Sequence, residues 1–323
     1  MFTGKVGVIN NMNAKKNRTG KYNKDVMQPI LGDLGFVKDT YTLEEMENAV
    51  DFFIEKEISF LGINGGDGSI QKIITTWINK AGGENLPKII PLAGGSTNVI
   101  LLYLDRKPVT PIETLNNFVL KLNKYQLLYS EINLLKIEIE QDNFQTVYGF
   151  SFANGVVYKL VEMFLENNKP SVSWIMKKIM QIIGGVSMRI DKYMYYIRPI
   201  DEKAKVDGKV FPENKVKATV MTSFEKPFPT FTVFKSVDRK AGEAYYMVSN
   251  LAFPAILNNI HNILFGLGEV IKGDTAGEHW IGSAKELSLF TKEGFMFDGE
   301  LYKPEKETNI TVSVGPLVTL VRV

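Results

Sequence analysis

The sequence predicts an α/β domain with a parallel sheet at residues 1–130, followed by a β-rich domain at residues 131–323. Short apolar segments alternate with helical patterns through the first third of the chain, as in strand–helix–strand units. Beyond residue 130, segments with a period of two outnumber the helical ones. The length of 323 residues also fits about two domains. The last strands are candidates for packing back on the first domain.

The first domain contains four apolar strands in the order expected for a parallel sheet. A helix ending near Gly35 follows the first strand, and a second helix starts after Thr42, which forms a capping-box pair with Glu45. Further helices follow two glycine-rich turns. The expected strands are at residues 5–10, 36–41, 58–64 and 88–92.

The second domain combines many strands with a few helical patterns. The expected helices are at residues 154–167, 172–183 and 255–265. The expected strands are at residues 132–140, 193–198, 215–222, 230–237, 244–250, 285–291, 295–302 and 308–323.

Composition excludes several classes of function. The 38 Lys and Arg residues nearly balance the 36 Asp and Glu residues, so we expect no nucleic-acid partner. The absence of cysteine excludes disulfides and thiolate chemistry, and the two histidines, His261 and His279, are expected to be structural or surface residues. No segment reads as a signal peptide or reaches the roughly 20 apolar residues of a membrane span. We therefore expect a cytoplasmic protein.

Two glycine-rich turns, Gly65–Ser69 and Gly94–Thr97, each follow a predicted strand and open a helix. In open α/β sheets the ligand crevice lies at the carboxyl ends of the strands, where helix N-termini present unpaired N–H groups that suit phosphate. Glycine lets these amides approach phosphate closely. Asp67 would repel phosphate unless a cation such as Mg²⁺ bridged the two. The alternative is that these glycines serve only the conformation of the turns.

Four segments together carry a resemblance to a known family, although neither usual nucleotide-binding motif is present. "NGGDGSI" (64–70) resembles the GGDGT loop of diacylglycerol, sphingosine and ceramide kinases and of the more distant NAD kinases. "NMNAKKNR" (11–18) resembles the N-P-x-A/S-G-x-x-R loop of the lipid kinases. "IIPLAGGSTNVI" (89–100) is similar to their P-x-G-T-x-N segment. "FMFDGELYKP" (295–304) and "ITVSVGPLVTLV" (310–321) resemble the D-G-E strand and the closing strands of their second domain.

The resemblance to the diacylglycerol kinase catalytic-domain family implies an ATP- and Mg²⁺-dependent lipid kinase. It also implies an α/β nucleotide-binding domain, a β-sandwich-like domain and an active site between them. Asp67 would organise Mg²⁺, and Asn11 would border the nucleotide. The residues that would hold phosphate are Gly65, Gly66, Gly68, Ser69, Gly95, Ser96 and Asn98.

The resemblance also suggests a general base. In bacterial diacylglycerol kinases the Asp of D-G-E is proposed to take the proton of the lipid hydroxyl, and the Glu to orient it, which points to Asp298 and Glu300. In sphingosine kinases the GGDGT aspartate has that role, which would fall on Asp67. We favour Asp298. Alternatively, Asp298-Gly299 is only the type I′ turn of a β-hairpin.

Residues 171–185 form an apolar helical pattern with a narrow polar face that includes Lys177 and Lys178. This pattern is typical of a buried core helix, or of a helix that faces a lipid pocket or a membrane with anionic headgroups. In the second case the protein would associate peripherally with the membrane and bind a lipid substrate.

Departures from the family pattern leave alternatives open. Met12 replaces a proline, and Lys15 stands where the loop glycine is expected. A soluble NAD kinase-like enzyme and a non-catalytic lipid- or nucleotide-binding protein therefore remain alternatives to a lipid kinase. The phosphorylated lipid and the oligomeric state do not follow from the sequence.

Overall fold

A computed structural model describes the greater part of the chain and divides it into two compact units. Unit 1 comprises Met1–Leu134, Thr146–Gly149 and Gly315–Val323, and unit 2 comprises Leu135–Gln145 and Phe150–Val314. The described residues are 5–92, 94–95, 99–104, 109–141, 144–166, 172–227, 233–260, 262 and 277–323.

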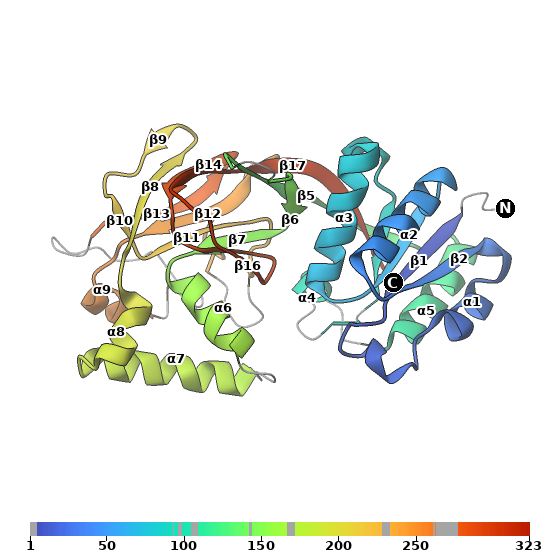
Figure 1. Ribbon diagram of the computed structural model, residues 1–323, viewed down its shortest axis with the longest axis horizontal. Coiled ribbons are helices and arrows are strands. Elements are labelled where there is room, and N and C mark those ends of the chain that lie inside the picture. Colours follow the sequence, from blue (N-terminus) through green and yellow to red (C-terminus); the bar gives the residue numbers. More distant parts are fainter. Residues whose placement is uncertain are drawn as a thin grey trace. The chain divides into compact units, whose positions relative to one another are not determined.

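Unit 1 is built on a parallel sheet, as the strand–helix alternation predicts. Its strand order is β17-β4-β3-β1-β2, and β17 joins it through a parallel pairing of Leu320 with Ile89 (Figure 1). The strands are β1 (Val6–Asn11), β2 (Gly35–Thr40), β3 (Phe60–Asn64), β4 (Lys88–Pro91) and the last part of β17 (Thr308–Arg322).

Helices cover both faces of this sheet because successive strand residues point to opposite sides. On one face, α1 and α5 pack against Val6 and Val8. On the other, Phe53 of α2 lies against Gly7, and α2 packs beside α3 (Figure 1). The expected Thr42–Glu45 capping box is present. The helices are α1 (Lys24–Leu31), α2 (Leu43–Glu55), α3 (Asp67–Ala81), α4 (Val99–Tyr103) and α5 (Pro111–Asn123).

Unit 2 contains two antiparallel arrays of strands. The first has the order β13 (His279–Ala284), β12 (Ala244–Ser249), β11 (Ala218–Thr222), β7 (Ser151–Asn154), β15 (Phe295–Phe297), β16 (Glu300–Tyr302). The second has the order β10 (Lys215–Val216), β8 (Ile200–Val206), β14 (Glu286–Thr291), β17, with β9 (Lys209–Val210) paired to β8. Strand β5 (Leu128–Ile139) pairs with β17 and with β6 (Val147–Gly149).

The two arrays of unit 2 face each other across a core that includes one buried carboxyl group. Glu202 of β8 is 2% exposed. It accepts a hydrogen bond of 2.5 Å from the Thr219 hydroxyl on β11 and another from the Asn154 amide on β7. Burial raises the pKa of Glu202 to about 7, against the effect of these two donors. The β-rich second domain is thus sandwich-like, as expected.

Helices of unit 2 pack on the outer face of the six-stranded array. Val161 of α6 lies in a cluster with Ala153, Val220, Met247 and Met296, which come from four of its strands. Next to α6 lie α7 and α8 (Figure 1). The helices are α6 (Val156–Glu166), α7 (Val172–Ser187), α8 (Asp191–Ile197) and α9 (Phe253–Asn258).

Several predicted elements of the second domain are wrong. Residues 193–198 were expected as a strand but belong mainly to α8, because Tyr193 and Tyr196 lie one helical turn apart and line the same space beside α7. The described part of 230–237 forms a turn, at 233–236. Strands β6, β7, β8, β9 and β13 were not expected. Among the described residues, no helix is long and apolar enough to cross a membrane.

Candidate functional site

Three loops of unit 1 meet at the carboxyl ends of β1, β3 and β4. The side-chain amide of Asn11, the last residue of β1, donates a hydrogen bond of 2.9 Å to the Ser69 hydroxyl in the first turn of α3. The Lys16 N–H donates one of 3.3 Å to the Gly94 carbonyl after β4. Most of the predicted phosphate-binding residues therefore come together in space.

Two asparagines that the sequence analysis did not single out connect these loops. Asn17 is fully buried, and its amide donates to the Asn11 carbonyl at 2.8 Å and to the Asn64 carbonyl at 3.0 Å. Asn64, the last residue of β3, is also fully buried, and neither polar atom of its side chain has a hydrogen-bond partner among the residues that the structure describes. The sequence signal for Asn64 was a polar residue just before Gly65-Gly66, at the end of a strand whose other residues are mostly apolar.

The glycines of these loops are required for different reasons. A Cβ atom at Gly65 would collide with the Ser69 side chain, and one at Gly94 would lie 2.9 Å from the Gly65 nitrogen. These two glycines let the loops pack together. A Cβ atom at Gly66 would meet only the Gly95 Cα atom among the described residues, at an ordinary 3.4 Å, and the φ of Gly66 is −91°. Packing within the described part of the protein therefore does not require glycine at position 66.

Asp67, Gly68 and Ser69 form the first turn of α3, whose N-cap is Gly66. N–H groups at this end of a helix lack intrahelical partners and carry partial positive charge, so the turn suits an anion. The described residues hold no group of three or more acidic, His or Cys side chains that would ligate a metal ion. A single carboxylate still fits Mg²⁺, which usually takes its other ligands from phosphate and water.

Two of the predicted phosphate-binding residues, Ser96 and Asn98, lie outside the described residues, as does His261. Their predicted roles stay predictions. His279 lies in β13 and is 6% exposed, so it is a buried residue.

Asp298 and Gly299 form the two-residue turn between β15 and β16. Their φ values are 47° and 86°, and Phe297 pairs with Glu300 across the turn. These are the positive φ angles of a type I′ turn, so the predicted turn at Asp298-Gly299 is present. The Asp298 carboxylate also accepts hydrogen bonds from the N–H groups of Phe150, at 3.0 Å, and of Ser151, at 2.8 Å.

A second Asp-Gly turn in unit 2 has the same local structure. Asp207 and Gly208 join β8 to β9 with φ values of 46° and 77°. The Asp207 carboxylate accepts hydrogen bonds from the N–H groups of Lys285, at 3.0 Å, and of Glu286, at 2.9 Å. The turns differ in exposure, since Asp207 is exposed and Asp298 is half-buried.

The residues around the two turns also differ. Glu300 follows the first turn directly and is exposed, whereas Lys209 takes the same place after the second. Ser151, whose N–H donates to the Asp298 carboxylate, has its hydroxyl 2.7 Å from that of Thr222. Asp298 and Glu300 belong to unit 2, and the three loops belong to unit 1.

Solved structures share this fold, although the sequence matches no protein-family model and no curated protein. A putative diacylglycerol kinase from Bacillus anthracis is similar with a TM-score of 0.64 and 17% identity. Two further structures from that organism, a diacylglycerol kinase and a putative one, have TM-scores of 0.62 and identities of 16% and 15%. Each comparison covers 99% of this chain and 98% of the other. The fold expected from the motifs is therefore confirmed.

Proposed function

We propose that this protein is an ATP- and Mg²⁺-dependent lipid kinase that transfers the γ-phosphoryl group of ATP to a hydroxyl of a membrane lipid. The observation that carries the proposal is the meeting of three loops at the carboxyl ends of β1, β3 and β4. Gly66 lies at this meeting, and packing among the described residues does not require glycine there. The fold shared with diacylglycerol kinases supports the same function.

Unit 1 would bind the nucleotide. Phosphoryl transfer depends on positioning and on charge neutralisation rather than on covalent chemistry of the protein. The N–H groups at the start of α3 would hold phosphate oxygens, together with the loop at Gly95. Asp67 would hold Mg²⁺, which would neutralise the phosphate charge. Asn11, fixed by its hydrogen bond to Ser69, would border the nucleotide.

Unit 2 would supply the base. In the proposed step the lipid hydroxyl oxygen bonds to the γ-phosphorus while the bond to the bridging β–γ oxygen breaks and ADP leaves. The Asp298 carboxylate takes the hydroxyl proton. The two backbone N–H groups that hold this carboxylate stabilise its charge and fix its orientation. Glu300, two residues further, would help to orient it.

The direct test is transfer of labelled phosphate from ATP in mixed micelles that contain diacylglycerol, ceramide or a sphingoid base. We expect one of these lipids to be labelled in the presence of Mg²⁺ and none in the presence of a chelator. Labelling of NAD instead of any lipid would contradict the proposal. Asp67→Asn should raise the Mg²⁺ concentration that half-maximal activity requires.

Nucleotide binding can be tested without the lipid. Gly66→Val should weaken the calorimetric affinity for Mg²⁺-ATP roughly tenfold or more while leaving the melting temperature nearly unchanged, because the branched side chain enters space that the described residues leave open. Gly65→Ala is the matched control and should lower the melting temperature, since its Cβ collides with Ser69. A folded Gly66→Val protein with unchanged ATP affinity would contradict phosphate binding at this loop.

A further inference from the structure

The helix expected at residues 171–185 is α7, and it does not behave as a buried core helix. Ile182 and Val186 are buried, but most of its other apolar side chains are half-buried, and Met180 is 62% exposed. Met188, just after α7, is 75% exposed, and Leu165 of α6 is 58% exposed. Apolar side chains of α7 and of its neighbour α6 are therefore only partly covered.

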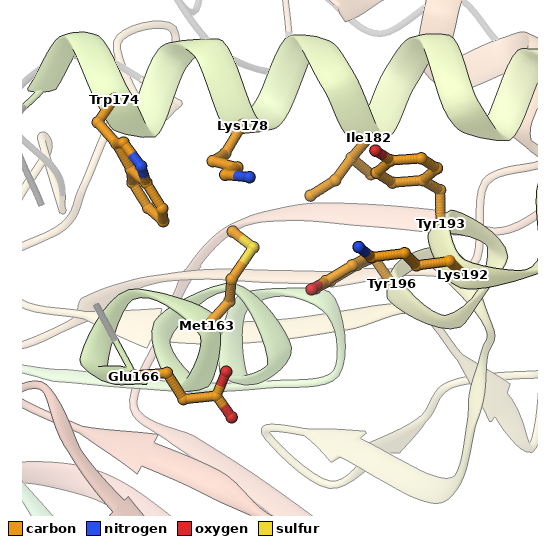
Figure 2. Close-up of a pocket in the computed structure, with 8 residues that line it drawn as sticks. All are labelled: Met163, Glu166, Trp174, Lys178, Ile182, Lys192, Tyr193 and Tyr196. Atoms are coloured by element: carbon orange, nitrogen blue, oxygen red, sulfur yellow. The ribbon is translucent and has the colours of Figure 1, made fainter.

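A cavity of about 550 Å³ lies between these three helices. Ligand sites typically measure about 300–1,000 Å³, so this volume suits a small molecule better than a two-chain phospholipid. Figure 2 shows Trp174 and Ile182 of α7 and Met163 of α6 reaching into the space between their helices. These side chains form an apolar wall.

The α8 side of the cavity depends on one close contact. A Cβ atom at Gly185 of α7 would collide with the Tyr193 ring, so glycine is what lets α8 approach α7 there. Tyr193 and Tyr196 then turn their rings toward the cavity (Figure 2). Burial, together with the Glu166 and Glu162 carboxylates, raises the pKa of Tyr196, so its hydroxyl stays protonated and able to donate a hydrogen bond.

Two lysines give the cavity its charge. Lys178 of α7 and Lys192 of α8 both line it, and Glu166 is the one acidic lining residue within the part of the chain that the structure describes. Their ammonium groups lie 5.5 Å from the Trp174 ring and 6.0 Å from the Tyr193 ring. Neither lysine forms an ion pair with any described residue. Lys192 is exposed and Lys178 half-buried, so the lining combines an apolar wall with two positive charges and the one negative charge of Glu166.

We propose that this cavity binds a single-chain amphiphile with an anionic headgroup. The chain would lie against Trp174, Met163 and Ile182, and the two lysines with the tyrosine hydroxyls would bind the headgroup. A carboxylate and a phosphate monoester share the chemistry that these groups recognise. None of the proposed kinase acceptors, which are diacylglycerol, ceramide and a sphingoid base, has an anionic headgroup, so this site selects a different ligand. The inference rests on unit 2 alone and does not depend on phosphoryl transfer.

The test is a binding titration with four probes below their micellar concentrations: oleate, oleoyl-lysophosphatidate, mono-oleoylglycerol and inorganic phosphate. Trp174 is one of three tryptophans and lines the cavity, so its fluorescence reports occupancy. We expect one or both anionic lipids to change the emission and the other two probes to bind at least tenfold more weakly. Trp174→Phe should abolish the change in emission. Calorimetry on the unaltered protein should give the same affinities as the fluorescence titration. Response to oleate alone would identify a fatty acid, and response to lysophosphatidate alone a phosphate headgroup.

The charged residues give a matched pair of variants. Replacing both Lys178 and Lys192 with Gln should weaken the binding of anionic lipid roughly tenfold or more, because each replacement removes a charge-assisted contact with the headgroup. Replacing both Lys177 and Arg189 with Gln removes the same charge from exposed positions that do not line the cavity, and should leave the affinity unchanged. Equal losses in the two variants would overturn the proposal in favour of general attraction to positive charge. Equal affinity for mono-oleoylglycerol, or no binding of either anionic lipid, would also overturn it.

Discussion

The two Asp-Gly turns of unit 2 have nearly the same structure, but we propose chemistry for only one of them. In both, the aspartate and the glycine have positive φ, and the carboxylate accepts hydrogen bonds from the backbone N–H groups of two consecutive residues at the start of another strand. In both, the aspartate N–H also donates to the carbonyl of one of those residues, Ser151 for Asp298 and Glu286 for Asp207.

Because the two turns are so alike, the geometry of Asp298 alone does not distinguish a catalytic aspartate from a structural one. Holding a turn and a neighbouring strand is a sufficient reason for an aspartate at either position. A catalytic role for Asp298 has to come from what differs, which is its lower exposure and the glutamate, rather than lysine, after the glycine. Asp207 therefore serves as an internal control for Asp298.

The largest expected effect is on turnover. Asp298→Asn should lower the rate at saturating Mg²⁺-ATP and lipid by about 10²–10⁴-fold, because a general base is lost. Asp207→Asn should leave the rate nearly unchanged. Both variants should lose a similar free energy of unfolding, about 1–3 kcal/mol, because each weakens hydrogen bonds to a charged group. Near-normal turnover in Asp298→Asn, with turnover lost in Asp67→Asn at every Mg²⁺ concentration, would assign the base to Asp67.

The next effect is a pH dependence of the free energy of unfolding, which variants of both turns should share. Burial raises the pKa of Glu202 to about 7, whereas an exposed glutamate in the unfolded chain titrates near 4.5. The folded state therefore holds this proton more tightly, and the free energy of unfolding should fall by about 3 kcal/mol as the pH rises from about 4.5 to about 7. Denaturant titrations across this range should show a flatter pH dependence for Glu202→Gln. An unchanged slope would contradict the raised pKa.

The glycines of the two turns should behave alike. Gly299→Ala and Gly208→Ala each place a Cβ atom at a positive φ but in open space, so both should lose about 1–2 kcal/mol of unfolding free energy. Thermal or chemical denaturation measures this. If the two variants lose the same unfolding free energy but only Gly299→Ala loses turnover, activity depends on the exact geometry of the first turn.

The smallest expected effect concerns Glu300. If this exposed residue only orients the base, Glu300→Gln should lower turnover by less than tenfold, and Lys209→Gln, its counterpart, should have no effect. Initial rates under the same saturating conditions provide the comparison. A loss as large as that of Asp298→Asn would give Glu300 a direct part in proton transfer.

The sequence predicted the Asp298-Gly299 turn because its signal is local, and the parallel sheet because apolar strands and helices alternate clearly. It did not predict β8, where Ile200, Ala204 and Val206 alternate with charged residues but Glu202 occupies an inward position. A buried carboxyl group is recognisable only when its partners on other strands are known. Residues 193–198 were predicted to form a strand, whereas Asp191–Ile197 form α8, which packs against α7.

In the candidate site, too, local sequence signals identified some residues, and others depend on contacts that form only on folding. The glycine loops and Asn11 could be found from motifs, because phosphate binding by helix N-termini leaves a pattern in the sequence. Asn17 could not, since its side chain joins two segments that meet only in the folded chain. The lining of the cavity in unit 2 is likewise spread over three helices, and only α7 had a recognisable pattern.

Strand β17 has a consequence for the order of folding during synthesis. Its last residues, Gly315–Val323, belong to unit 1, although the rest of that sheet is encoded in the first 91 residues. A nascent chain that has not yet reached residue 315 leaves β4 as an exposed sheet edge, which invites pairing with other chains. Domains usually fold in the order in which they emerge from the ribosome. Here the unit that is translated first can complete its sheet only after all of the other unit has been made.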